Sequence, residues 1–336
     1  MKDYSSIVVS SVVSLRRNLF GFDFPSMLDE RNGVKVLNKV ADNILKLDGS
    51  FKIYKIKTLP EIDKNIMFEK GLISKRLLSS EDFGATILSE NEEESVMVNE
   101  EDHIVETCSM VGLNLIAAYD KLNELDNQIL SRLDIAFDNM FGFLTSNIAK
   151  AGTGLDAKIN LFLPGLFLTG KIRNVQAEIN NMNVDINFAR DTRYPDCQYC
   201  YYISNAQTIG RKESEYVLKL CELAIKICEM EIAARNELLM PLNVDETKDR
   251  VFRAWGILTN CYKINENEAQ KYLEELKLGV ALNFIRFKDA KCIETLFVDV
   301  LPYSLTKISD SKVTSVELDK YRATFLSNVL KAKRVK

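Results

Sequence analysis

Two neighbouring glutamates, an aspartate and the chain's single histidine, Glu100-Glu101-Asp102-His103, are the residues whose types and spacing best suit chemistry. They come directly after the apolar run at 96–98, which is typical of a short strand. Carboxylates at a strand end can hold a cation and accept a proton from it. Acidic pairs are also common on solvated surfaces. The catalytic interpretation therefore depends on other parts of the sequence.

A second candidate is the cysteine pair Cys197-Gln-Tyr-Cys200, whose spacing allows redox or metal chemistry. The chain has seven cysteines at scattered positions, which is typical of reduced thiols. A structural zinc site needs four ligands, and the chain offers one histidine and no second pair with this spacing. We therefore expect no metal and two buried or loop thiols. A metal or redox role is the weakest of three functional hypotheses.

The acidic run must be positioned by the elements around it. Residues 85–89 and 95–99 flank the acidic turn at 90–94, which predicts a β-hairpin, and residues 51–57 alternate as a half-buried strand does. Apolar residues at helical spacing predict helices over 113–122, 126–141 and 213–239, and Pro241 ends the last of these. Gly152-Thr-Gly154 predicts a turn before the apolar run at 159–168.

After Asn243 the pattern is helical almost throughout, over 247–258, 266–278, 290–301 and 318–331, with Asn265 or Glu266 and Ser315 at expected N-terminal caps. We therefore place a domain boundary near Pro241. Residues 1–241 are predicted to form an antiparallel α+β domain, and residues 242–336 a small all-helical domain.

Composition limits the functional classes. The chain has 336 residues, 46% of them hydrophobic and 27% charged, with a net charge of −4. It has no basic excess that would indicate nucleic acid and no apolar run long enough for a membrane span. Residues 1–14 are read as a strand that enters the fold, not as a signal peptide. We expect a cytoplasmic protein.

The run Asn-Glu-Glu-Asp-His at 99–103 resembles the catalytic segment of the ATP:guanido phosphotransferases, and the whole chain resembles one group of them, the bacterial protein-arginine kinases. The further motifs that carry this resemblance, all in family order, are Leu72-Ile-Ser74, Leu133-Asp-Ile-Ala-Phe-Asp138, Gly142-Phe-Leu-Thr145, Gly152-Thr-Gly-Leu155, Leu161-Phe-Leu-Pro164, the Tyr-Ile-Ser-Asn-Ala-Gln-Thr-Ile-Gly run at 202–210, and the Asp-Arg-Val-Phe-Arg-Ala-Trp-Gly run at 249–256. Chance would not place so many in order at the right spacing.

The resemblance implies a large antiparallel sheet flanked by helices, followed by the helical C-terminal domain. It implies ATP and Mg²⁺ as cofactors of an active enzyme, with Glu100 and Glu101 as the catalytic carboxylates. Ser10, Ser11 and His103 would be remnants of the nucleotide site.

The family also has a phosphoarginine-binding motif near its C-terminus. Here that motif is partial: Asp319, Arg322 and Ala323 match it, but its leading arginine is replaced. The alternative for these residues is an ordinary pair on a helix surface. Implied partners are proteins, namely a zinc-finger activator, stress-response repressors, the Clp unfoldase or an intact kinase paralogue, in a homo- or heterodimer.

Five arginines that bind phosphate in this family are absent. The family's Ser-Ser-Arg-x-Arg-Leu-Ala-Arg-Asn run appears as Ser-Ser-Val-Val-Ser-Leu-Arg-Arg-Asn at 10–18, so only Arg17 is kept. Val105 and Asp156 stand at two further arginine positions. The family's acceptor loop falls on residues 187–192, where neither its arginine nor its glutamate survives.

We therefore keep two main hypotheses. The first is an impaired kinase or pseudokinase that acts by binding other proteins. The second is an active protein-arginine kinase with a rebuilt phosphate clamp, for which Arg16, Lys150, Lys158, Arg190 and Arg193 are the basic candidates. Several basic side chains that converge on the cleft beside Glu100 and Glu101 would overturn the first hypothesis and favour the second.

Overall fold

The computed structural model describes residues 3–47, 51–80, 83–181, 186–191, 196–289, 292–309, 314 and 316–335. The chain forms two compact units. Unit 1 comprises Met1–Asn160, Glu178–Phe188 and Tyr202–Ile225, and unit 2 comprises Leu161–Ala177, Ala189–Tyr201 and Lys226–Lys336. The predicted boundary near Pro241 stays a prediction, since these units divide the chain elsewhere.

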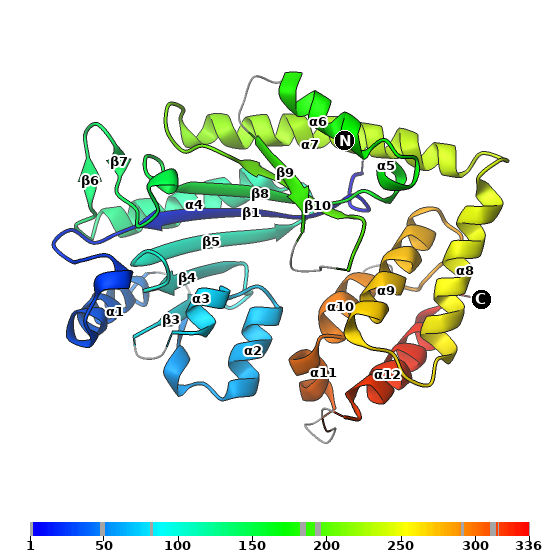
Figure 1. Ribbon diagram of the computed structural model, residues 1–336. Coiled ribbons are helices and arrows are strands. Elements are labelled where there is room, and N and C mark those ends of the chain that lie inside the picture. Colours follow the sequence, from blue (N-terminus) through cyan, green and yellow to red (C-terminus); the bar gives the residue numbers. More distant parts are fainter. Residues whose placement is uncertain are drawn as a thin grey trace. The chain divides into compact units, whose positions relative to one another are not determined.

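An eight-stranded sheet forms the centre of the α+β architecture (Figure 1). Its strands, in spatial order, are β2 (Lys52–Lys55), β3 (Ala85–Leu88), β4 (Glu94–Val98), β5 (Ile104–Val111), β1 (Val8–Arg17), β8 (Leu155–Phe162), β10 (Cys200–Asn205) and β9 (Ile186–Arg190). The pairs from β2 to β1 are antiparallel. The predicted fold class and the hairpin before the acidic run are confirmed.

Strand β1 crosses the middle of the sheet, and its burial alternates along most of its length, as expected for a strand with two different faces. Val13, Leu15 and Arg17 are buried on one face, whereas Ser14 and Arg16 lie on the other. In the register with β5, Arg16 lies opposite Val105 and Arg17 opposite Ile104. This register brings the C-terminal end of β1 to the start of β5.

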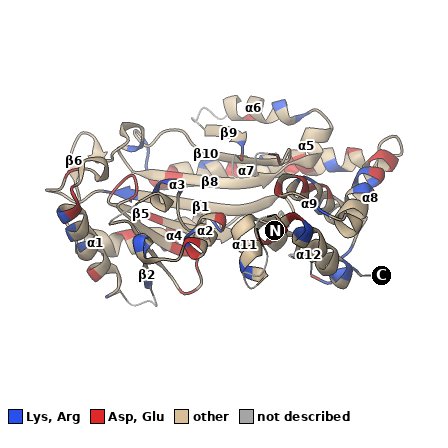
Figure 2. Ribbon diagram, turned by 60° about the horizontal axis from the view of Figure 1, so that its bottom comes forward, with Lys and Arg blue, Asp and Glu red and all other residues tan. Residues whose placement is uncertain are grey.

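Unit 1 also contains several helices. They are α1 (Glu30–Ile44), α2 (Glu61–Glu69), α3 (Lys75–Leu78), α4 (Leu115–Leu130) and the first part of α7 (Glu213–Leu238), with short 3₁₀ turns at Pro25–Met27, Ile56–Thr58 and Ile148–Lys150. Helix α4 packs against β1 and β5. Helix α1 carries both basic and acidic residues, and so does α8 of unit 2 (Figure 2).

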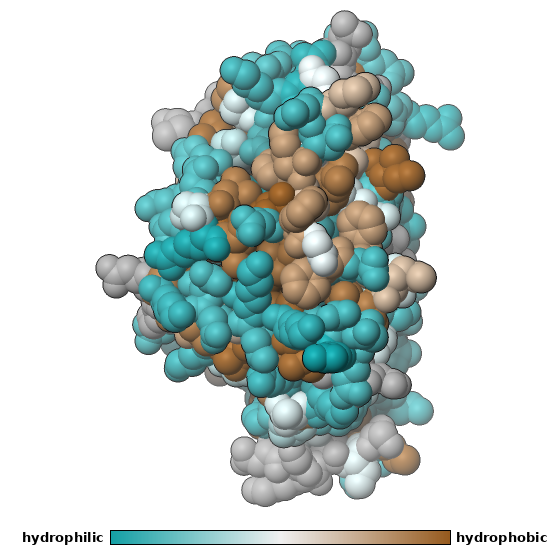
Figure 3. Space-filling model, turned by 90° about the vertical axis from the view of Figure 1, so that its left-hand side faces the viewer, coloured by the Kyte–Doolittle hydropathy of each residue, from teal (hydrophilic) through white to brown (hydrophobic). Residues whose placement is uncertain are grey.

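The helix predicted over 126–141 is wrong beyond Leu130. The chain there turns and forms the short hairpin β6 (Phe137–Asp138) and β7 (Gly142–Phe143). A bridge between Leu19 and Ile135 holds this segment in extended form, which overrides its helical spacing. Phe137, Met140 and Phe141 of the hairpin region are exposed. Figure 3 views the molecule from the left-hand side of Figure 1 and shows apolar side chains gathered on that face.

Unit 2 is mainly helical. Its helices are α5 (Pro164–Leu168), part of α6 (Ile172–Asn181), the end of α7, α8 (Val244–Asn260), α9 (Glu266–Ala281), α10 (Cys292–Asp299), α11 (Pro302–Ile308) and α12 (Leu318–Lys333). Leu258, Leu273, Leu296 and Leu326 lie in its buried core. The predicted cap at Asn265 is confirmed, because its side chain accepts a hydrogen bond from the Glu268 N–H at 2.9 Å.

The predicted helix over 290–301 corresponds to α10, although residues 290 and 291 and the expected cap Ser315 lie outside the described residues. Within the described ranges, none of the helices combines the length and the apolar character needed to cross a membrane.

Candidate functional site

The acidic run forms the tight connection between β4 and β5. Asn99 opens it in the left-handed region, with a φ of 56°, which asparagine tolerates better than most residues. The Asn99 side-chain amide donates to the carbonyls of Gly33 and Phe83, both at 3.0 Å. The connection is thus tied to the start of α1 and to the residues before β3, which fixes where the carboxylates that follow must lie.

Glu100 and Asp102 are held by the protein, whereas Glu101 is more open. Ser74 Oγ donates to Glu100 Oε1 at 2.5 Å. Asp102, which is fully buried, accepts from Asn18 Nδ2 and from the Ser146 N–H, both at 2.7 Å. The Glu101 side chain remains 31% exposed. One carboxylate of the pair therefore faces solvent while its neighbours are anchored.

Arg16 extends from β1 into this group of carboxylates. Its Nη1 lies 3.1 Å from Glu101 Oε2, 3.3 Å from Asp102 Oδ2 and 3.6 Å from Glu100 Oε2, and its side chain is 15% exposed. Burial works against its charge, but the neighbouring carboxylates, Asp102 foremost, outweigh this and raise the pKa of Arg16. A permanent guanidinium cation therefore lies on the carboxylates.

Arg17, the arginine that the resemblance retains, lies inside the fold. Its Nε and Nη2 donate to the two carboxylate oxygens of Asp126 at 3.0 and 2.7 Å, and its Nη1 donates to the Thr153 carbonyl at 2.8 Å. The guanidinium also lies 3.7 Å from the centre of the Phe143 ring. It is 1% exposed, so it links β1, α4 and the glycine turn from within and does not face a ligand.

Further carboxylates crowd around Arg17. Glu213 Oε1 lies 3.7 Å from Arg17 Nη2, and the buried Glu106 lies in the same cluster. Burial, with the charge of Asp126, raises the pKa of Glu106 well above its usual value. The pKa of Glu213 is also raised, chiefly by burial. The single positive charge of Arg17 thus faces several carboxyl groups. The raised pKa values favour protonation of Glu106 and Glu213, which reduces the negative charge around Arg17.

His103 is fully buried beside the acidic run. Its Nδ1 accepts from the Leu19 N–H at 3.1 Å, and its own backbone N–H donates to Asn18 Oδ1 at 2.9 Å. Burial lowers the pKa of the imidazole, against weaker opposing effects of the Asp23 backbone and the Asp102 charge. His103 is therefore a neutral side chain that holds the β1 end against the acidic connection.

The two serines of the expected nucleotide remnant lie at the other end of β1. Ser10 pairs with Val111, six residues from Arg16, which is roughly 20 Å along a strand. Ser11 is buried and donates to the Gly112 carbonyl at 2.7 Å, and Ser10 Oγ accepts from Asn160 Nδ2 at 2.8 Å. The structure does not bring Ser10 and Ser11 to the carboxylates, and their role in nucleotide binding stays a prediction.

The other basic candidates have different partners. Lys150 Nζ lies 3.1 Å from Asp156 Oδ2, and Lys158 Nζ lies 4.0 Å from the centre of the Tyr202 ring. Arg190 donates to the Cys197 carbonyl in unit 2. Arg193 lies outside the described residues. Of the five candidates, Arg16 is the one for which the described part of the chain has an ion pair with Glu100 and Glu101.

The segment expected to correspond to the acceptor loop does not form a loop over most of its length. Residues up to Arg190 belong to β9, and the Asp191 N–H donates to the Cys200 carbonyl at 2.9 Å. Thr192 lies outside the described residues.

The partial phosphoarginine motif lies on α12. Arg322 is 2% exposed, and it donates to the carbonyls of Val300 and Ile264 at 2.8 and 3.0 Å and to Asp319 at 2.6 Å. Ala323 is buried in the core of unit 2. Arg322 and Asp319 do pair within one helix, as the alternative expected, but Arg322 is buried and does not lie on the helix surface. Arg322 thus joins α12 to the segments before α9 and α11.

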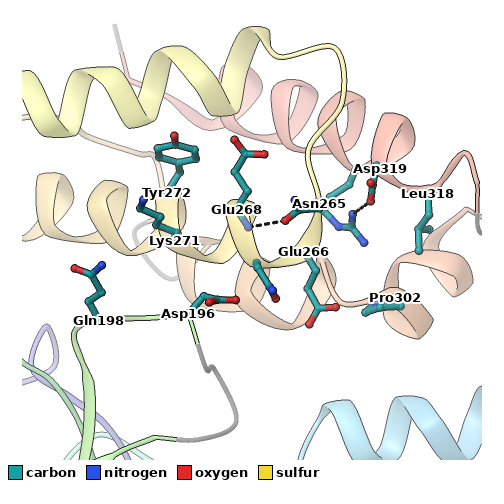
Figure 4. Close-up of a pocket in the computed structure, with 12 residues that line it drawn as sticks. Asp196, Gln198, Asn265, Glu266, Glu268, Lys271, Tyr272, Pro302, Leu318 and Asp319 are labelled. Atoms are coloured by element: carbon teal, nitrogen blue, oxygen red, sulfur yellow. Dashed lines mark hydrogen bonds and ion pairs between the residues drawn. The ribbon is translucent and has the colours of Figure 1, made fainter.

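A cavity of about 720 Å³ lies beside this motif (Figure 4). Its charged lining residues are Asp196, Glu266, Glu268, Asp319, Lys271 and Arg322. The acids outnumber the bases, and Arg322 already donates to protein oxygens. Such a lining disfavours a phosphorylated guanidinium, which carries negative charge. Whether Asp319, Arg322 and Ala323 recognise phosphoarginine stays a prediction.

The sequence singled out Cys197 and Cys200, but it did not indicate that Glu274 joins them in one cluster of unit 2. Glu274 of α9 accepts from the Gln198 and Tyr199 N–H groups at 2.7 and 2.8 Å, and Cys200 Sγ lies 3.6 Å from its Oε1. The Sγ atoms of Cys197 and Cys200 and a Glu274 oxygen all lie within 4.8 Å of one another. Glu274 follows Cys200 by 74 residues, so no spacing rule could have found it.

Comparisons with known proteins agree with this architecture. Residues 34–234 match the family model of the ATP:guanido phosphotransferase C-terminal catalytic domain, and residues 244–336 match that of the protein-arginine kinase McsB C-terminal domain. The protein-arginine kinases of Geobacillus thermodenitrificans and Halothermothrix orenii are each 33% identical to this chain. The first alignment covers 97% of this chain and 91% of the relative, and the second 96% and 93%.

Solved structures show the same fold. The substrate-free duplicated taurocyamine kinase from Schistosoma mansoni matches with a TM-score of 0.61 and 21% identity, over 68% of this chain and 34% of that chain. A lombricine kinase matches with a TM-score of 0.62 and 18% identity, over 70% and 69%. The family models and the sequence relatives show that the chain belongs to the protein-arginine kinase family of the ATP:guanido phosphotransferases.

Proposed function

We propose that this family member is impaired as a kinase and acts mainly by binding other proteins. One observation carries the proposal: the guanidinium of Arg16 lies on Glu100, Glu101 and Asp102. A protein-arginine kinase must bring the guanidinium of its acceptor to carboxylates of this kind. Here an internal guanidinium is already in that position.

Competition follows from the identity of the two groups. An incoming arginine side chain would replace Arg16 with a group of the same charge and shape, so the exchange gains little free energy. The internal group is attached to β1 and needs no association entropy, whereas an acceptor must lose translational and rotational freedom. In the family's run, this position is an alanine, which leaves the carboxylates open. Arg16 therefore acts against acceptor binding.

The positions expected to bind phosphate also support an impaired kinase. Val12 and Ser14 stand on β1 where the family has arginines, and Asp156, which pairs with Lys150, stands at another. These residues do not fit a polyphosphate, because none of the three supplies a cation. Losing one preorganised donor costs about 2.7–4 kcal/mol of transition-state stabilisation, and two independent losses slow transfer by roughly 10⁴-fold. ATP and Mg²⁺, the cofactors of an active family member, would bind weakly.

The proposed binding partners are those that the family suggests: a zinc-finger activator, a Clp unfoldase or an intact kinase paralogue, in a homo- or heterodimer. Support comes from the helical segment at 244–336, which matches the family while the phosphate-binding positions do not. A chain that keeps its scaffold and loses its charged clamp is better suited to holding proteins than to turnover.

Two measurements test the impairment. Calorimetry with ATP and Mg²⁺ should show no submillimolar affinity. Mass spectrometry of a basic protein incubated with the chain, ATP and Mg²⁺ should show no more phosphoarginine than a Glu101→Gln control. Phosphoarginine that forms with the natural chain and disappears in the control would overturn the proposal.

A second candidate is an active protein-arginine kinase with a rebuilt phosphate clamp. It is favoured by the same side chain, because Arg16 is a basic group that does converge on the twin glutamates. The variant Arg16→Ala separates the two. If Arg16 blocks the acceptor position, its removal leaves phosphoarginine formation unchanged or raises it. If Arg16 clamps phosphate, its removal abolishes whatever activity the natural chain has.

A further inference from the structure

The thiols of Cys197 and Cys200 and the carboxylate of Glu274 form a compact group of ligand atoms within unit 2. Cys197 is 1% exposed, Glu274 is 1% exposed and Cys200 is half-buried. Among the residues that the structure describes, this is a group of three such side chains whose ligand atoms lie within 4.8 Å of one another. None of the three belongs to the carboxylate site of unit 1.

The distances fit a tetrahedral metal ion. With zinc–sulfur bonds of about 2.3 Å and zinc–oxygen bonds of about 2.0 Å, a tetrahedral ion would hold sulfur and oxygen roughly 3.5 Å apart. The separation between Cys200 Sγ and Glu274 Oε1 is 3.6 Å. The two-residue spacing between the cysteines is also the usual spacing for paired thiolate ligands. The separation between this sulfur and this oxygen is thus the one that a tetrahedral zinc ion would require.

The surroundings orient the ligands, as outer contacts do in metal sites. The N–H groups of Gln198 and Tyr199, both between the cysteines, donate to the two oxygens of Glu274. The Tyr199 hydroxyl donates to Glu275 at 2.7 Å, and Arg250 donates to Glu275 at 2.9 Å. Arg190 donates to the Cys197 carbonyl. The cysteine loop is therefore fixed against α9 by bonds that leave both sulfur atoms turned to the carboxylate.

Charge gives a second reason for a cation here. The carboxyl group of Glu274 and the thiols of Cys197 and Cys200, three groups that can each lose a proton, lie together in a largely buried space. A divalent cation in their midst would stabilise all three anions at once.

We propose that Cys197, Cys200 and Glu274 bind one zinc ion, with both cysteines as thiolates, Glu274 as the oxygen ligand and a water or another exchangeable ligand in the fourth position. Binding releases the two thiol protons, and any proton on Glu274, to solvent. Zinc is the ion of choice because two thiolates with one carboxylate suit it better than Mg²⁺ or Ca²⁺, which prefer oxygen ligands. The ion would join the cysteine loop to α9.

Cobalt(II) is the probe for the natural chain, because it takes tetrahedral thiolate sites and absorbs light through them. Titration of the reduced full-length chain should give one bound Co²⁺ per chain, with a thiolate-to-metal charge-transfer band of the intensity of two thiolates. Added Zn²⁺ should remove this band, whereas added Mg²⁺ should not. A chain that shows no such band at a tenfold excess of Co²⁺ would overturn the proposal.

Variants assign the ligands. Cys200→Ser should halve the band, and Glu274→Gln should weaken Co²⁺ binding by at least the roughly 10–100-fold that even outer contacts command. Cys261→Ser is the matched control, because Cys261 is a half-buried free thiol elsewhere in unit 2. It should leave the band and the affinity unchanged, and equal losses in this control would count against the assignment.

Thermal unfolding of the natural chain keeps the test independent of how the variants fold. One equivalent of Zn²⁺ should raise the melting temperature of the reduced chain, and a chelator should reverse the rise. Equal melting temperatures with and without Zn²⁺ would contradict a structural ion. Mild oxidation to a Cys197–Cys200 disulfide before titration should abolish Co²⁺ binding, and binding that survives it would place the ion elsewhere.

Discussion

Arg16 and Arg17 are neighbours in β1, yet they serve opposite faces of the sheet in different ways. Arg17 uses Nε and Nη2 to bind both oxygens of Asp126, and it is 1% exposed. Arg16 reaches its three carboxylates through Nη1, and its Nε has no acceptor among the described residues. The strand's alternation decides which arginine becomes part of the core and which enters the candidate site.

The difference shows that a residue retained from the family can be structural, while a residue new to the family's run lies at the candidate site. Arg17 is kept by the resemblance, but its bidentate, buried geometry makes it a structural residue. Arg16 has no counterpart in the family's run, but its positive charge lies against the carboxylates of the candidate site. Loose contacts can be exchanged for a ligand more easily than a buried fork can. Four predictions test this contrast.

Loss of Arg17 should have the largest effect. Arg17→Ala leaves Asp126 buried without its cation, and breaking such a pair costs about 3–5 kcal/mol of unfolding free energy. Urea denaturation followed by circular dichroism measures this as a lower midpoint. Arg132→Ala on the exposed surface nearby is the control and should stay within about 0.5 kcal/mol. A small loss of unfolding free energy in Arg17→Ala would mean that Arg17 is not the structural arginine of the two.

Glu106 should make the stability of the Arg17 cluster depend on pH. Its pKa is raised in the folded chain from a usual value of 4.5, by burial first and by Asp126 next, while Arg17 opposes the shift and Glu213 adds to it. The folded chain therefore keeps a proton that the unfolded chain has released. The contribution of Glu106 to the unfolding free energy is therefore greatest below the pKa that Glu106 has in the unfolded chain. It falls by up to about 1.4 kcal/mol per pH unit as the pH rises towards the pKa of Glu106 in the folded chain.

The variant Glu106→Gln isolates this effect. It keeps the size of the side chain and removes its titration, so the decline of the unfolding free energy above about pH 4.5 should become shallower. Glu124→Gln changes an exposed glutamate of α4 and should leave the slope as it is in the natural chain. An unchanged slope in Glu106→Gln would mean that other groups, such as Glu213, account for the pH dependence.

Removal of Arg16 should affect binding more than folding. Arg16→Ala frees Glu100 and Glu101, so the affinity for a guanidinium ligand such as agmatine should rise about tenfold, or about 1.4 kcal/mol. Arg16→Lys keeps a cation there and should show a smaller rise. Calorimetry gives both affinities. Unchanged agmatine binding in Arg16→Ala would show that Arg16 does not compete for the carboxylates.

Loss of the Lys150–Asp156 pair should have the smallest effect on stability. Both side chains are partly exposed, at 25% and 34%, and such pairs contribute about 0–1 kcal/mol. Lys150→Ala should therefore leave the urea midpoint nearly unchanged. Asp156→Arg, which restores the family's charge, should instead raise the affinity for ATP and Mg²⁺ in calorimetry. A large loss of stability in Lys150→Ala would contradict the proposed division between core and site.

The sequence predicted the parts of this molecule that depend on local pattern. The hairpin of β3 and β4 and the acidic connection after it follow from alternation and from a turn of acidic residues. The helix predicted over 126–141 was wrong beyond Leu130, because apolar spacing does not show that Leu19 pairs with Ile135 across the fold. Long-range pairing of this kind outweighs local propensity.

The candidate site was predictable only in part. Arg16 was one of five basic candidates, and strand alternation could have placed it on the face of Val12 and Ser14. Nothing in the sequence indicated that Asp126 holds Arg17, because these residues are 109 positions apart. Arg322 matched a binding motif, but its burial depends on carbonyls contributed by other helices and loops. Contacts set by tertiary structure therefore decide the roles of matching residues.

Ser74 connects the carboxylate site to a fragile element. Its Oγ donates to Glu100 and accepts from the Leu77 N–H at 3.0 Å, which caps the four-residue helix α3. A cap of this kind contributes about 1 kcal/mol, a large share of the stability of one helical turn. Any molecule that draws the Glu100 carboxylate away would release the hydroxyl and loosen that turn. Hydrogen exchange at the Leu77 amide would then register occupancy of a site the amide never touches.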